Sequence, residues 1–223
     1  MRKYATNASS ELRLAYGQEL IIGLRVIDDT APLADALQEV QETLETRLDE
    51  RLAADATLTR ARVALRFADY TLDRMIRGVR RHAELLDGGR VGPLTTAVFP
   101  DGLVAETVPT GERQERRARA LLARVHELGT ANAETLRAQM LEPLAAAVET
   151  FAKSRASYDA AFEDVETRFA RERLARDAHR LQVERTMAHV RALFPDDPSM
   201  RELFFPDVSR SSRAKDEPPV EEA

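Results

Sequence analysis

The feature that most constrains this chain is the stretch between Pro32 and Gly88, which contains no proline. Apolar residues recur in it every three or four positions, a spacing that lines one face of an α-helix. Aromatic residues make up only 5% of the sequence and Trp is absent, which leaves too few strand-filling side chains for a β-sandwich or barrel. We therefore predict an all-α fold, and in this stretch the predicted helix-face positions are Leu33, Leu37, Val40, Leu44, Leu48, Leu52, Leu58, Leu65, Leu72, Met75, Ile76, Val79 and Leu86.

Charged residues in the same stretch separate into an acidic block at 35–50 and a basic block at 60–81. In an unbroken helix, like charges three and four residues apart would each cost roughly 0.2–0.5 kcal/mol per pair. Folding back near Asp55 would instead lay the two blocks side by side. We predict a helical hairpin with Asp55 or Thr57 as the N-cap of its second helix, and the alternative is one unbroken helix.

The second half of the chain repeats this organisation, with a predicted kink at Pro143 and a turn near Ser157, where Ser154 or Ser157 would cap the next helix. The motif Phe99-Pro100-Asp101 recurs as Phe194-Pro195-Asp196, which favours an internal duplication. We predict an antiparallel up-down-up-down bundle of long helices that forms one domain over 1–207. Its parts are a hairpin at 9–88, a long irregular loop at 88–111, a second hairpin at 112–194, a Phe-Pro-Asp segment at 195–207 and a disordered tail at 208–223.

Capping residues predict several helix boundaries. Ser9 or Ser10 is placed to cap the first helix, and Pro32 favours a break or kink after it. Gly88-Gly89 is a strong signal for a helix C-terminus. Asp197 followed by Pro198 predicts a short helix near the end of the chain.

An aromatic stripe in the second half has the spacing of a coiled-coil seam. It consists of Phe151, Tyr158, Phe162, Val165 and Phe169. We expect it to belong to the bundle core, so that Phe162→Ala would cost on the order of 3–5 kcal/mol. A surface location would instead make the stripe a face for a partner.

Charge and composition exclude several classes of partner. The formal net charge of −5 argues against general affinity for nucleic acid or for an anionic membrane surface. No apolar run approaches the roughly 18–20 residues of a membrane span. No apolar segment of a signal peptide follows the N-terminus, so a cytoplasmic location is expected.

The sequence also offers no recognisable chemistry. The absence of cysteine excludes disulfides, thiolate metal sites and Cys nucleophiles. A di-iron site needs Glu-x-x-His pairs, and none of the four histidines has a metal ligand three residues before it; these are His82, His126, His179 and His189. We therefore predict no catalytic residues, no metal and no cofactor.

Function is then expected to be that of a non-enzymatic interaction or scaffold protein. Its partner would be a protein, either another chain or a second copy in a homodimer. The alternative is an anion- or nucleic-acid-binding module built from arginines on both sides of the 88–111 loop. The residues of that candidate site are Arg77, Arg80, Arg81, Arg116 and Arg117.

Overall fold

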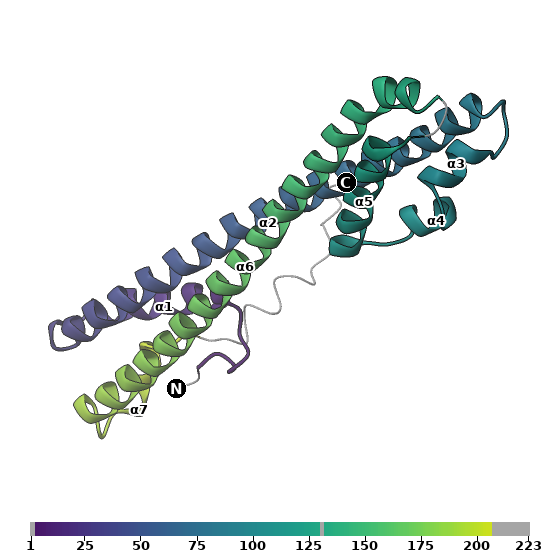
Figure 1. Ribbon diagram of the computed structural model, residues 1–223. Coiled ribbons are helices and arrows are strands. Elements are labelled where there is room, and N and C mark those ends of the chain that lie inside the picture. Colours follow the sequence, from purple (N-terminus) through teal and green to yellow (C-terminus); the bar gives the residue numbers. More distant parts are fainter. Residues whose placement is uncertain (1–2, 130–131, 207–223) are drawn as a thin grey trace, which may run out of the picture. The chain divides into compact units, whose positions relative to one another are not determined.

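The computed structural model describes residues 3–129 and 132–206, and within these ranges the regular structure is entirely helical. Two helices are much longer than the rest and extend over most of the chain (Figure 1). The elements in order are α1 (Ser10–Leu24), η1 (Asp28–Thr30), α2 (Ala31–Leu86), α3 (Pro93–Val98), α4 (Gly102–Thr107), α5 (Gly111–Glu127), α6 (Ala133–Leu193) and α7 (Pro198–Leu203). The all-α prediction is confirmed. None of these helices combines the length and apolarity that a membrane-spanning segment requires.

The long helices α2 and α6 each run without a break through the positions where turns were predicted. Asp55 lies inside α2 and Ser157 inside α6, so the two predicted turns are wrong, and so are the hairpins that depended on them. Ending a helix leaves four N–H and four C=O groups without helical partners. The segment around Asp55 contains no Gly or Pro that would favour a helix end. The repulsion of a few like-charge pairs is too weak to break the helix there.

Most of the capping predictions are confirmed. The Ser9 side chain accepts a hydrogen bond from the Leu12 amide at 3.3 Å at the start of α1. Asp197 caps α7 through the Met200 amide at 2.9 Å. After α2, Gly88 and Gly89 adopt φ angles of 90° and 86°, which only glycine reaches without strain.

The prediction for the connection after α2 differs from the structure. The 88–111 loop is not fully irregular, because it contains the short helices α3 and α4. Pro143 lies within α6, and the helix continues through it, so the kink predicted there stays a prediction. The predicted tail at 208–223 lies outside the described residues.

The described chain divides into two compact units. Unit 1 contains the residues up to Ala54 and from Val165 onward, and unit 2 is Asp55–Asp164. Helices α2 and α6 contribute one part to each unit. The single domain over 1–207 and the internal duplication remain predictions.

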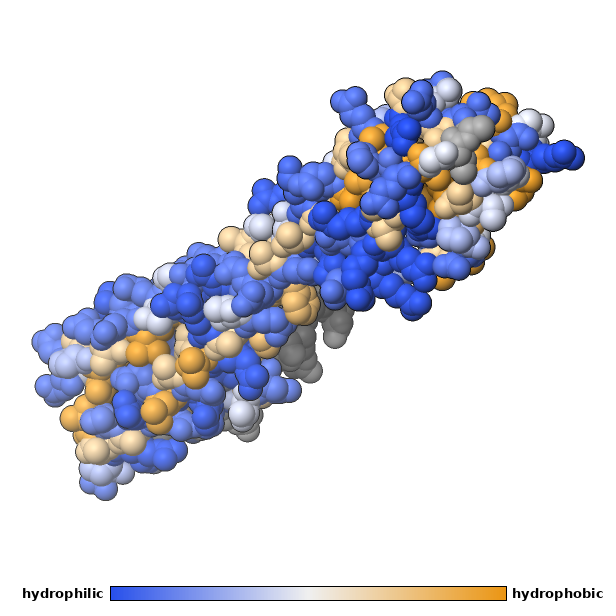
Figure 2. Space-filling model, in the orientation of Figure 1, coloured by the Kyte–Doolittle hydropathy of each residue, from blue (hydrophilic) through white to orange (hydrophobic). Residues whose placement is uncertain are grey.

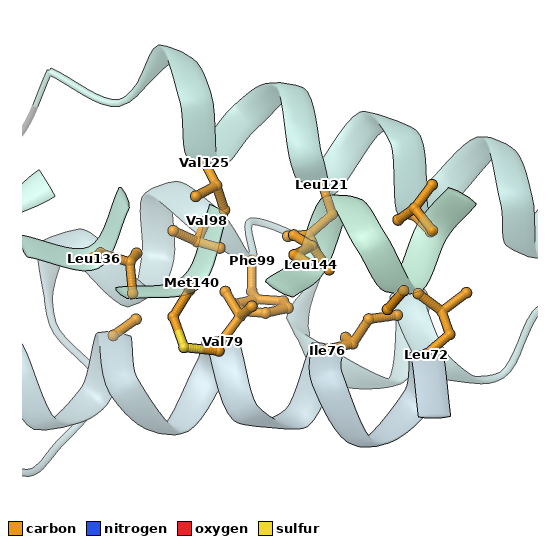
Figure 3. Close-up of a cluster of buried hydrophobic side chains, with 14 of the residues drawn as sticks. Leu72, Ile76, Val79, Val98, Phe99, Leu121, Val125, Leu136, Met140 and Leu144 are labelled. Atoms are coloured by element: carbon orange, nitrogen blue, oxygen red, sulfur yellow. The ribbon is translucent and has the colours of Figure 1, made fainter. Parts of the chain in front are cut away.

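The core of unit 2 is apolar, and α3 and α4, the short helices within the 88–111 segment, contribute to it. Helices α3 and α4 both pack on α5 (Figure 1). Side chains from α2, α3, α5 and α6 meet between the helices (Figure 3), and those labelled are Leu72, Ile76, Val79, Val98, Phe99, Leu121, Val125, Leu136, Met140 and Leu144. The 88–111 connection is ordered because its own side chains pack into this core.

The core of unit 1 is formed by α1 against the first part of α2 and the last part of α6. The N-terminal segment adds Tyr4, and the segment after α7 adds Phe204 and Phe205. The central apolar residues are Leu20, Ile21, Leu24, Leu37, Val183 and Val190.

The aromatic stripe of α6 is buried at one end only. Phe151 is 2% exposed and belongs to the core of unit 2, whereas Phe162 is 49% exposed. Phe162 stacks on Tyr158 with ring centroids 6.4 Å apart. The prediction that Phe162 lies in the core is therefore wrong, because helical spacing alone does not show where a third element covers a long helix.

Substituting Ala56 by proline tests whether α2 is continuous. Ala56 is exposed and lies inside α2, so Ala56→Pro should reduce the free energy of unfolding by about 3 kcal/mol or more through the lost hydrogen bond and the ring clash. Denaturant unfolding measures this, with Ala56→Ser as the control that leaves the helix intact. A loss below about 1 kcal/mol would favour a turn here, because a proline directly after an Asp55 cap is well tolerated.

The two phenylalanines of the stripe should respond very differently to truncation. Phe151→Ala should cost on the order of 3–5 kcal/mol, because it leaves a cavity in the core of unit 2. Phe162→Ala should cost less than about 1 kcal/mol, as expected for a half-exposed side chain. Chemical denaturation midpoints compare them, and equal losses would contradict this assignment.

Candidate functional site

The five arginines of the predicted anion site lie on two helices, Arg77, Arg80 and Arg81 on α2 and Arg116 and Arg117 on α5. Three of them pair with carboxylates: Arg77 with Asp73 at 3.4 Å, Arg80 with Glu84 at 2.7 Å, and Arg117 with Asp101 at 3.3 Å. Arg81 and Arg116 are exposed. The pairing reduces the local positive charge, and a ligand site made by all five remains a prediction.

Unit 2 also contains an open cleft of about 440 Å³ between α2, α6 and the start of α5. Its wall combines apolar side chains with three arginines, the apolar ones being Leu65, Phe151 and Tyr158 and the arginines Arg62, Arg66 and Arg155. Sequence reasoning missed this cleft, because its residues come from three helices whose packing the sequence does not specify.

Charges in the cleft are largely balanced. Arg155 binds Glu115 at 3.2 Å and Asp159 at 3.5 Å. Asp69 also lines the cleft and accepts a hydrogen bond from Gln114 at 2.5 Å. The cleft can accommodate an apolar group, but its acidic residues offset much of the attraction for an anion.

Unit 1 contains a buried ionic cluster centred on Glu172, whose side chain is fully buried. Its carboxylate accepts hydrogen bonds from the Ser10 hydroxyl at 2.5 Å, from Arg176 at 2.6 Å and from Arg51 at 2.5 Å. Burial by itself would raise the pKa of Glu172, but these hydrogen bonds and the two guanidinium charges outweigh it and lower the pKa. The cluster therefore keeps a charged carboxylate inside unit 1 and ties α1, α2 and α6 together.

A second chain of hydrogen bonds passes through His179, which is also fully buried. The Tyr4 hydroxyl lies 2.8 Å from Nδ1, and the Gln41 side-chain oxygen lies 3.2 Å from Nε2. Gln41 in turn donates to the Leu14 carbonyl at 2.9 Å. This arrangement suits a neutral ring that accepts from Tyr4 and donates to Gln41. Burial lowers the pKa of His179 to about 4, and the Arg13 charge adds to this.

Gly17 provides the space for this chain of hydrogen bonds. A Cβ atom at Gly17 would lie 1.9 Å from the Gln41 side-chain oxygen and 2.7 Å from His179 Nε2. Arg13, 3% exposed, stacks over the Tyr4 ring at 4.7 Å and donates to the backbone of Thr6 and Ala8. These contacts fasten the N-terminal segment to unit 1, which assigns the buried polar groups a role in folding.

The described residues contain no group of three or more His, Asp or Glu side chains arranged to hold a metal ion. On the face that Figure 2 shows, the surface of each unit is mainly hydrophilic with scattered apolar areas. One group of exposed apolar side chains has a regular pattern on a single helix.

In unit 2, the solvent-facing side of α2 carries Val63, Phe67 and Tyr70, which are 39%, 66% and 64% exposed. They are separated by four and then three residues, so they form a stripe along the helix. The buried positions of the same helix, Ala68 and Leu72, fall on the opposite side by the helical period. Beside the stripe is an open hollow of about 340 Å³ lined by Arg66, Phe67 and Tyr70. Sequence reasoning missed this stripe because it followed only the core-facing series, although the second series has the same helical spacing.

Acidification should destabilise the protein through His179. The unfolded chain binds a proton near the ordinary pKa of about 6.5, whereas the folded chain does so only near 4, so stability falls as the pH drops through this window. Between pH 7 and pH 5 the free energy of unfolding should fall by about 2 kcal/mol. Denaturant unfolding at both pH values measures it. His179→Gln should flatten this dependence while the exposed His189→Gln keeps it, and equal slopes in both variants would refute the assignment.

Similarity to known proteins adds no assignment to these surfaces. No protein-family model, no curated protein and no solved structure matches this chain. The functional conclusion therefore depends on the chemistry of the cleft, the buried clusters and the α2 stripe.

Proposed function

We propose that this chain is a non-enzymatic interaction protein of the scaffold type, and that the solvent-facing side of α2 in unit 2 is a binding surface. The observation that carries the proposal is the stripe of Val63, Phe67 and Tyr70. Single exposed apolar residues are common on protein surfaces, but a row of them at helical spacing, two of them aromatic, is typical of a helix that docks against a partner.

The residue types in and beside the stripe support this proposal. Tyr, Phe and Arg are enriched at protein interfaces, and all three types line the hollow beside Phe67. An aromatic side chain gains the most free energy when it enters a partner's pocket, so Phe67 and Tyr70 are the expected anchors.

The perturbed titratable groups also fit a non-enzymatic role. His179 and Glu172 are buried in unit 1, and their hydrogen bonds join neighbouring helices. Buried hydrogen-bond and ion-pair networks with a purely structural role also shift the pKa values of their members, so these shifts do not require catalysis.

Anion or nucleic-acid binding is the second candidate. The three arginines at the unit 2 cleft favour it, because guanidinium groups bind carboxylates and phosphates well. Anion binding is the weaker candidate for two reasons. Asp69 and Asp159 lie on the same wall of the cleft. The arginines of the predicted anion site that pair with carboxylates are Arg77, Arg80 and Arg117.

Site-specific photo-crosslinking in the native source tests the proposed surface. A photoreactive phenylalanine analogue at position 67 should give adducts of discrete mass, because a partner covers this side of α2. The same analogue at Val104, which is 68% exposed in the same unit, is the control and should give none. Adding Tyr70→Ser should remove the adducts and leave the melting temperature within a few degrees. The absence of discrete adducts at position 67 would overturn the proposal.

A further inference from the structure

The apolar stripe of unit 2 is part of a longer series of residues on the exposed side of α2. Arginines continue the stripe in both directions with the same steps of three and four residues, which is the repeat of a coiled-coil seam. The series lies entirely in unit 2, and every residue in it is exposed: Arg60, Val63, Phe67, Tyr70, Arg74, Arg77 and Arg81. It is apolar in the middle and basic at both ends.

The exposed charges on this part of α2 all have the same sign. Between positions 55 and 86, the exposed charged residues are all arginines, namely Arg60, Arg62, Arg66, Arg74, Arg77 and Arg81. The acidic residues of the same stretch are only partly exposed, and one of them, Asp73, pairs with Arg77 at 3.4 Å. This side of the helix is therefore positive, although the formal net charge of the whole chain is −5.

The apolar middle of the series has the geometry that receives a side chain from another helix. In a coiled coil, each such side chain enters a hole between four residues of the facing helix, at positions i, i+3, i+4 and i+7. Val63, Arg66, Phe67 and Tyr70 have this spacing. The last three of them line the open hollow of about 340 Å³, so the hole is already present on the surface.

We propose that the partner covering this side of α2 is an acidic amphipathic helix of another protein. This inference rests on the proposed function and names the chemistry of the partner at that surface. An apolar side chain of the partner helix enters the hollow beside Phe67 and Tyr70. Asp and Glu residues at the following seam positions pair with Arg74 and Arg77, because guanidinium groups bind carboxylates through paired hydrogen bonds. Opposite charges at the ends of the seam also fix the register of the two helices.

A nucleic-acid strand fits this surface less well than a helix does. Proteins that bind single strands use a basic groove along which aromatic side chains stack on successive bases. Here the two aromatic residues of the series, Phe67 and Tyr70, are followed by arginines alone. The negative net charge of the chain also opposes binding to a polyanion, so the observations favour an acidic protein segment.

A synthetic helical peptide about three heptads long is the first probe. It carries leucine at three central seam positions and glutamate at the two seam positions on either side of them. Fluorescence anisotropy should show that it binds the full-length chain. Its dissociation constant should rise about tenfold when NaCl is raised from about 0.05 M to about 0.5 M, because salt screens the charge pairs. No binding at about 100 μM protein, or binding that salt does not weaken, would overturn the inference.

Charge reversal in the chain separates charge pairing from a loss of folding. Arg74→Glu with Arg77→Glu and Arg81→Glu should raise the dissociation constant of the acidic peptide at least about 30-fold. The same variant should gain binding to a peptide in which lysine replaces each glutamate, which a misfolded chain would not do. The matched control reverses three exposed arginines on α5 of the same unit, Arg113, Arg116 and Arg119. This control should keep binding of the acidic peptide within about threefold, and equal losses in both variants would overturn the inference.

Photo-crosslinking at position 67 in the native source separates this inference from the proposed function. The cross-linked segment of the partner should be rich in Asp and Glu and carry apolar residues every three or four positions. Reversing the charges of Arg74, Arg77 and Arg81 should reduce the yield of adducts at least about tenfold. Adducts that persist unchanged in that variant, or that contain a second copy of this chain or a nucleic acid, would overturn the inference and leave the proposed surface standing. No adducts at all would overturn both.

Discussion

Breaking α2 near Asp55 would leave the backbone groups of two helix ends without hydrogen-bond partners. The charge pairs that such a break would bring together stabilise the chain by much less than this costs. The helix therefore continues, and so does α6 at Ser157. The remaining elements are short by comparison, and each covers only part of a long helix. Phe151 is buried and Phe162 is half exposed on the same helix for this reason.

The two units stabilise their parts of the long helices by different means. Unit 2 uses an apolar cluster, in which the segment after Gly88 folds back as α3 and α4. Unit 1 combines an apolar cluster with buried polar groups that bind the N-terminal segment. Glu172 and His179 form hydrogen bonds with specific partners, and these bonds have defined directions. They therefore restrict the packing of the N-terminal segment to fewer arrangements than apolar contacts alone would.

The continuity of α2 also explains the proposed binding surface. A hairpin would have neutralised the acidic and basic blocks within one chain, whereas an unbroken helix leaves both exposed. In unit 2, Val63, Phe67 and Tyr70 lie on the side of α2 away from the core. This exposed stripe is what the interaction role proposed above rests on.

The sequence by itself determined the all-helical class, the caps at Ser9 and Asp197 and the end of α2 before Gly88, because these depend on residues close together in the chain. The sequence could not determine whether α2 turns near Asp55. The answer depends on the difference between two free energies, the small gain from pairing opposite charges and the cost of two new helix ends. Nor could it show the cleft around Arg62, Arg66 and Arg155 or the burial of His179, which depend on helices far apart in sequence. Only the tertiary structure showed that α2 also carries Val63, Phe67 and Tyr70 on an exposed side, because the packing of the other helices decides which apolar side chains are covered.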